Sequence, residues 1–163
     1  MRHVVATKIE VPSDSSEPIC DPQLQREQAS ALVLFLNYKK YHWLTYGPHF
    51  RDLHLLFEEH ATQVLESIDE LAERSLMVDG RPIADPTRYI PASLVAPSEG
   101  ELNVKQMLEE ALAAHEEIIH AMHDDAEVAT KASDIGTADL FTRLVQVHQK
   151  QRWFLKELLR KES

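Results

Sequence analysis

The most informative stretch of this sequence lies at residues 42–74 and reads HWLTYGPHFRDLHLLFEEHATQVLESIDELAER. The Gly47-Pro48 pair interrupts it and indicates a turn between two segments. After the turn, apolar side chains recur at steps of three and four residues, at Leu53, Phe57, Ala61, Val64, Ile68 and Leu71. This period predicts an amphipathic helix over 49–79, and a preceding segment at 23–46 that folds back on it as a helical hairpin.

Glycine and proline divide the rest of the chain in the same way. Long segments at 101–135 and 137–160 meet at Gly136, and both carry apolar residues at helical spacing. The connection at 80–100 holds four prolines and is long enough to cross from one end of a bundle to the other, with one short helix near 87–93. The sequence therefore predicts an all-α, four-helix bundle over 23–163, with a crossover between its second and third long helices and a flexible lead segment at 1–22.

Composition restricts the possible partners. The 163 residues include 17 Lys and Arg against 27 Asp and Glu, and the net charge of −10 disfavours a general electrostatic grip on nucleic acid or anionic lipid. The single cysteine, Cys20, excludes an intrachain disulfide. No apolar run reaches the length of a membrane span, and residues 1–22 lack the pattern of a signal peptide, so we expect a cytoplasmic protein without a membrane partner.

Four side chains with metal-ligand chemistry share one stripe of the 49–79 helix. His54, Glu58, Asp69 and Glu73 follow one another at spacings of 4, 11 and 4 residues. A metal ion needs its ligands within a few ångströms, yet the 15 residues from His54 to Asp69 span roughly 22 Å of helix. One chain therefore cannot close a metal site from these four residues.

Two copies of this helix, paired antiparallel about a twofold axis, would close two sites. Residues whose numbers sum to about 127 then face each other, which places His54 opposite Glu73 and Glu58 opposite Asp69. His42 joins from the preceding helix, because the hairpin places it beside His54. Two imidazoles with two or three carboxylates suit Fe(II), Mn(II) or Zn(II). The competing interpretation is that these residues form a row of solvated charges on the helix surface and bind no metal.

The remaining histidines leave alternatives open. His60 and His115 interrupt the apolar stripes of their helices, so each is either a core histidine with a hydrogen-bond partner or an added metal ligand. Glu117-x-x-His120 matches half of the paired Glu-x-x-His pattern of di-iron bundles, but this chain has no second copy of the motif. A solvated acidic face is therefore the preferred interpretation for His120 and His123.

The metal-ligand stripe lies within a longer pattern. The string His42-Trp43-x3-Gly47-Pro48-x-Phe50-x3-His54, followed by Glu58 and Asp69-x2-Ala72-Glu73-Arg74, resembles the signature of the Dps miniferritins. The resemblance extends to Thr137-Ala138-Asp139 and Trp153, and so covers about residues 24–160. It implies a hollow homododecamer with ferroxidase centres at twofold interfaces, to which one chain gives His42, His54 and Glu58 and its partner gives Asp69 and Glu73.

The same resemblance implies that Fe(II) is oxidised, preferentially by hydrogen peroxide rather than oxygen, and stored as ferric mineral, which protects against oxidative stress. It also assigns Glu59 to mineral nucleation and Asp139 to an acidic threefold pore. Two alternatives remain: a non-catalytic shell that binds zinc, and a structural protein that compacts DNA. We expect DNA binding to be weak or absent, because residues 1–22 hold only Arg2 and Lys8 against four acidic residues.

Overall fold

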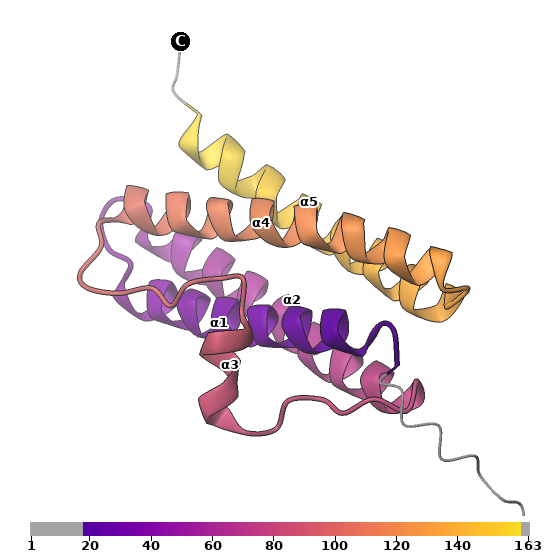
Figure 1. Ribbon diagram of the computed structural model, residues 1–163. Coiled ribbons are helices and arrows are strands. Elements are labelled where there is room, and N and C mark those ends of the chain that lie inside the picture. The colour runs from indigo at the N-terminus through magenta and orange to yellow at the C-terminus, as the bar shows by residue number, and fades with distance from the viewer. Residues whose placement is uncertain (1–17, 161–163) are drawn as a thin grey trace, which may run out of the picture.

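The structure, a computed structural model of the chain, describes residues 18–160. Its helices are α1 (Asp21–Leu44), α2 (Phe50–Met77), α3 (Pro86–Ala92), α4 (Val104–Lys131) and α5 (Ile135–Leu159). Within this range the chain forms no strand. The prediction of an all-α, four-helix bundle is confirmed (Figure 1).

The bundle consists of two helical hairpins joined by the crossover. Helix α1 pairs mainly with α2, and α4 pairs mainly with α5. The crossover leaves the end of α2, carries α3 along the outer side of α1, and reaches the start of α4 at the opposite end of the bundle (Figure 1). The short helix lies at 86–92, within one residue of its predicted position.

The helix ends follow local sequence. Asn103 and Gln106 form a reciprocal capping box at the start of α4, and the Asp134 side chain accepts from the Thr137 backbone N–H at the start of α5. Helix α1 begins at Asp21, two residues before the predicted boundary, because a proline such as Pro22 is well tolerated in the first turn. The expectation of a flexible lead concerns mostly residues 1–17, which lie outside the described range.

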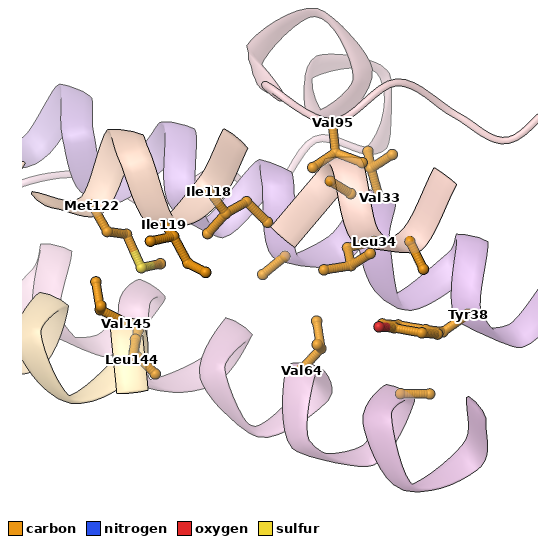
Figure 2. Packing of buried hydrophobic residues seen from close by; sticks show 14 of the residues in the cluster. Val33, Leu34, Tyr38, Val64, Val95, Ile118, Ile119, Met122, Leu144 and Val145 are labelled. Carbon is orange, nitrogen blue, oxygen red and sulfur yellow. The ribbon is translucent and has the colours of Figure 1, made fainter. Parts of the chain in front are cut away.

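Apolar side chains from the four long helices fill the interior. Figure 2 shows Leu34 of α1, Val64 of α2, Ile118 of α4 and Leu144 of α5 converging on it, while Val95 of the crossover covers the outer side of α1. Among residues 18–160, no helix has the length and apolar character needed to cross a membrane.

Candidate metal centre

His42 near the end of α1 and His54 near the start of α2 lie face to face. Their rings stack with centroids 3.7 Å apart and planes inclined by 22°. The turn around Gly47, whose φ of 94° favours glycine, reverses the chain between them. The hairpin therefore brings together two imidazoles that are 12 residues apart in sequence, as the spacing predicted.

Each imidazole is held by the backbone of the other residue. The Nδ1 atom of His42 lies 2.8 Å from the carbonyl oxygen of His54, and Nδ1 of His54 lies 2.8 Å from the carbonyl oxygen of His42. Since a carbonyl only accepts, Nδ1 donates in both rings, and Nε2 is the nitrogen that carries the lone pair in the neutral form of each ring. This reciprocal arrangement presents two nitrogen donors of the kind that bind metal ions.

Glu58 adds an oxygen donor one helical turn after His54. Its Oε2 atom lies 3.4 Å from Nε2 of His42, and its side chain is 44% exposed. The Lys39 ammonium donates a hydrogen bond to the same carboxylate and lies 5.7 Å from the Trp43 ring centroid. That hydrogen bond lowers the pKa of Glu58, so the carboxylate stays ionised.

Lys39 was not identified by the sequence reasoning. Its only signal was its position three residues before His42, on the same side of α1. A metal ion that binds Glu58 must compete with this ammonium, so Lys39 opposes metal binding while it keeps the ligand charged.

Asp69 and Glu73 lie far from this cluster. Both are exposed on α2, and the 11 residues from Glu58 to Asp69 correspond to about 16 Å along the helix axis. Over residues 18–160, no group of three or more His, Cys, Asp or Glu side chains is arranged to hold a metal ion. In a single chain His42 stacks on His54 and Glu58 lies near His42, but these three side chains do not by themselves form a metal site, and Asp69 and Glu73 lie apart from them.

Apolar side chains share the face of α2 that carries the metal-ligand stripe. At 100° per residue, Leu55, Leu65 and Leu76 fall within the same arc of about 100° as the four candidate ligands. These leucines are 49%, 48% and 60% exposed. A helix face that combines exposed leucines with candidate metal ligands has the composition of a protein interface.

The structure places His60 in the core, where its Nδ1 atom lies 3.1 Å from the hydroxyl of Tyr38. His115 is also buried, and its Nε2 atom lies 2.5 Å from the same hydroxyl. His148 joins them, with Nδ1 2.8 Å from Nδ1 of His115. The sequence reasoning did not identify Tyr38 or His148 as polar partners, although His148 lies one turn from Leu144 on the apolar stripe of α5.

The other candidate residues are on the surface. Those exposed are Glu59, Glu117, His120, His123 and Asp139. His120 lies one turn from Asp124 on α4, with Nε2 3.9 Å from the carboxylate.

The motif residue Arg74 joins two elements, because its guanidinium donates to Asp134 at 2.5 Å and to Thr137 at 2.9 Å. Arg74 thereby fixes the end of α2, next to Glu73, against the start of α5.

Comparison with known proteins gives one consistent result. Residues 22–163 match the family Ferritin, described as a ferritin-like domain. The chain is 33% identical over 137 residues to DNA protection during starvation protein 1 of Deinococcus radiodurans, covering 83% of this chain and 66% of that protein's length.

Solved structures of Dps proteins also match this chain. Dps from Thermosynechococcus elongatus is 67% identical with a TM-score of 0.87, and the match covers 88% of this chain and 92% of that chain. A Dps protein from Vibrio cholerae, described as a member of a broad superfamily of ferritin-like diiron-carboxylate proteins, is 26% identical. Its TM-score is 0.81, with coverage of 98% of this chain and 100% of that chain.

Proposed function

The chain belongs to the Dps family of ferritin-like proteins, and from this premise we propose that it is a ferroxidase that oxidises Fe(II), preferentially with hydrogen peroxide, and stores the product as ferric mineral. The observation that carries the proposal is the pair of imidazoles at His42 and His54. Their Nδ1 atoms are bonded to backbone carbonyls, which leaves the two Nε2 atoms as the candidate ligand atoms, and that of His42 lies 3.4 Å from Glu58. Nitrogen and carboxylate donors together suit Fe(II), and Zn(II) fits the same donors.

The active unit is a pair of chains. A twofold axis near the middle of α2 brings His54 of one chain to Glu73 of its partner, and Glu58 to Asp69. The exposed Leu55, Leu65 and Leu76 lie on the face that this pairing buries. Six such pairs form the hollow homododecamer that encloses the mineral, with Glu59 at the inner surface and Asp139 at a threefold pore.

The chemistry is a two-electron reduction of peroxide. Two Fe(II) ions give one electron each, the O–O bond breaks, and two solvent protons complete two water molecules. His42 and His54 hold the substrate ions, and the ionised carboxylates of Glu58, Asp69 and Glu73 balance their increasing positive charge. Because both electrons arrive together, peroxide is consumed without release of a hydroxyl radical, which accounts for protection against oxidative stress.

Stopped-flow oxidation of Fe(II) tests this function. Fe(II) is loaded without oxygen, peroxide or oxygen is added, and ferric absorbance is followed. We expect Asp69→Ala to slow oxidation by about 10-fold or more, because it removes a partner ligand while leaving His42 and His54 intact. Asp124→Ala, which removes an exposed carboxylate from α4, is the matched control and should oxidise iron at the rate of the unmodified protein.

Two results would contradict the proposal. Unchanged oxidation by Asp69→Ala would place the chemistry elsewhere in the molecule. Stoichiometric binding of Fe(II) or Zn(II) without turnover by the unmodified protein would instead support the non-catalytic metal-binding shell.

A further inference from the structure

Inside the bundle, four buried side chains form a continuous chain of hydrogen bonds that the proposed iron site does not use. The Tyr38 hydroxyl lies 2.5 Å from Nε2 of His115 and 3.1 Å from Nδ1 of His60. His115 in turn lies 2.8 Å from His148, between their Nδ1 atoms. The exposure of all four residues is 2% or less. Figure 2 shows the Tyr38 hydroxyl directed into the bundle.

These groups are neutral in the resting protein. Burial lowers the pKa of His60 and of His148 to about 4, and that of His115 well below its ordinary value. Burial also raises the pKa of Tyr38, so the phenol keeps its proton. Each ring therefore has one protonated and one acceptor nitrogen.

Two opposite arrangements of protons satisfy the whole chain, and in both the Tyr38 hydroxyl donates to an imidazole, either His115 or His60. The first of them gives the longer route. The Tyr38 hydroxyl donates to Nε2 of His115, whose Nδ1–H donates to Nδ1 of His148, while Nδ1–H of His60 donates to the Tyr38 oxygen. The phenolic proton then has an acceptor at short distance, and that acceptor has a second imidazole behind it. This connectivity provides a route for one proton to leave the phenol inside an apolar core.

Tyr38 differs in this respect from the other tyrosines. Tyr41 donates to Glu110 at 2.9 Å, Tyr89 donates to the Ile83 carbonyl at 2.6 Å, and Tyr46 is exposed. Within residues 18–160, which include all four tyrosines, Tyr38 alone has an imidazole as the partner of its hydroxyl.

Tyr38 also lies close to the metal half-site. It precedes His42 by four residues on α1, which corresponds to about 6 Å of rise. Its ring lies 6.1 Å, between centroids, from the ring of Phe57, the residue before Glu58 on α2. An electron that leaves the Tyr38 ring therefore has a short path through packed side chains to the half-site.

We propose that Tyr38 is a redox-active residue that supplies the second electron to peroxide when an iron site holds only one Fe(II). This inference rests on the proposed ferroxidase function. Fe(II) gives one electron and the Tyr38 phenol gives the other, the O–O bond breaks, and two protons from solvent complete two water molecules. The phenolic proton moves to Nε2 of His115, so Fe(III), a neutral tyrosyl radical and an imidazolium remain.

The chemistry of phenols explains why the histidines are required. A phenol that loses an electron becomes a strong acid, and in a buried site only a hydrogen-bonded base can take its proton. His115 supplies that base, and transfer of its Nδ1 proton to His148 moves the positive charge away from the radical. A later Fe(II) ion returns the electron and the proton returns to the phenol, which restores the resting chain.

Electron paramagnetic resonance tests this role directly. The assembled protein, labelled with ring-deuterated tyrosine, is loaded with one Fe(II) per site, mixed with peroxide and frozen. We expect a neutral tyrosyl signal whose splitting changes with the label, and we expect Tyr38→Phe to abolish it while keeping the packed ring. Tyr41→Phe is the control, because it removes another buried hydroxyl of α1, and it should retain the signal.

A spin trap for hydroxyl radical gives a second readout. At one Fe(II) per site, the trapped yield should rise several-fold in Tyr38→Phe. At two Fe(II) per site it should match the unmodified protein. A purely structural role of Tyr38 would not produce this dependence on iron loading.

Photo-oxidation with a ruthenium complex tests the tyrosine without iron. A Tyr38-dependent radical in this experiment, with no iron oxidation in the first, would support the redox role and refute the ferroxidase. Normal iron oxidation with no Tyr38-dependent radical in either experiment would refute the redox role alone. A tyrosyl signal of equal size in Tyr38→Phe would also overturn the proposal.

Discussion

Histidines in this chain take two chemical roles according to what surrounds them. His42 and His54 bond their Nδ1 atoms to backbone carbonyls and keep Nε2 available, whereas His60, His115 and His148 lie in the core. Spacing predicted the first pair, because a hairpin of known turn position fixes which residues meet. For His60 and His115 the spacing predicted only an inward direction, because their hydrogen-bond partner Tyr38 lies on another helix and is brought to them by the tertiary structure.

The buried histidines should make stability depend on pH. In the unfolded chain each imidazole titrates near 6.5, whereas burial lowers the pKa of His60 and His148 to about 4 in the folded chain. Between these values the unfolded state binds more protons, so stability falls on acidification by about 1.4 kcal/mol per pH unit for each histidine. Full stability is present above pH 6.5 and decreases as the pH falls toward 4.

Urea unfolding at pH 7 and pH 5, at a fixed chain concentration, measures this effect. We expect His60→Leu to lose less stability than the unmodified protein over that interval, since it removes one imidazole whose pKa is lowered by folding. His123→Gln, which replaces an exposed histidine, should leave the pH dependence unchanged. Equal pH dependence of stability in all three proteins would contradict the lowered pKa of His60 in the folded chain.

At the level of helices, the sequence predicted most of what the structure contains. Periodicity predicted the four long helices with their ends within a few residues of the observed ones, and the proline-rich connection predicted the crossover with its short helix. The start of α1 was placed two residues late, because Pro22 was read as a break although it occupies the first turn. The contacts of Arg74 with Asp134 and Thr137 needed the tertiary structure, since 60 residues or more separate these partners.

Gly80, just after α2, allows a close approach to the start of α1. A Cβ atom there would lie 2.2 Å from a carboxylate oxygen of Asp21 and 2.9 Å from the Ser75 carbonyl oxygen. Asp21 also accepts hydrogen bonds from the Ser75 hydroxyl and from the Arg81 backbone N–H. Glycine is therefore required where the first hairpin closes on itself.

We expect Gly80→Ala to destabilise the protein by about 1–3 kcal/mol, because overlap with Asp21 and a backbone carbonyl forces the two helix ends apart. The midpoint of thermal unfolding measures the change. Gly100→Asn is the control, since its site is open and asparagine tolerates the positive φ of 64° found there. An unfolding midpoint for Gly80→Ala as high as that of the control would show that the contact is not tight.

For the whole molecule, charge sets the expected behaviour toward DNA. A net charge of −10 per chain, repeated over the shell, repels the phosphate backbone. In a mobility-shift assay at physiological salt we expect no complex with duplex DNA at about 1 µM chain. A complex at that concentration that dissolves as salt is raised would contradict this expectation and support the DNA-compacting alternative.

The central claim is that the iron site is divided between two chains, because α2 separates the ligands by more than a metal ion can bridge. His54→Ala removes one half of the site and Asp69→Ala removes the other, and each variant should be nearly inactive alone. When the two are co-assembled at equal amounts, half of the twofold pairs are mixed, and each mixed pair holds one intact site.

The most direct test is therefore the iron-oxidation rate of the co-assembled His54→Ala and Asp69→Ala proteins, compared with each variant alone and with preassembled shells mixed afterwards. The divided site predicts recovery of about one quarter of the unmodified rate on co-assembly. No recovery is expected from mixing shells that have already formed. A co-assembled protein as inactive as its two components would show that the ligands act within one chain and would contradict the account.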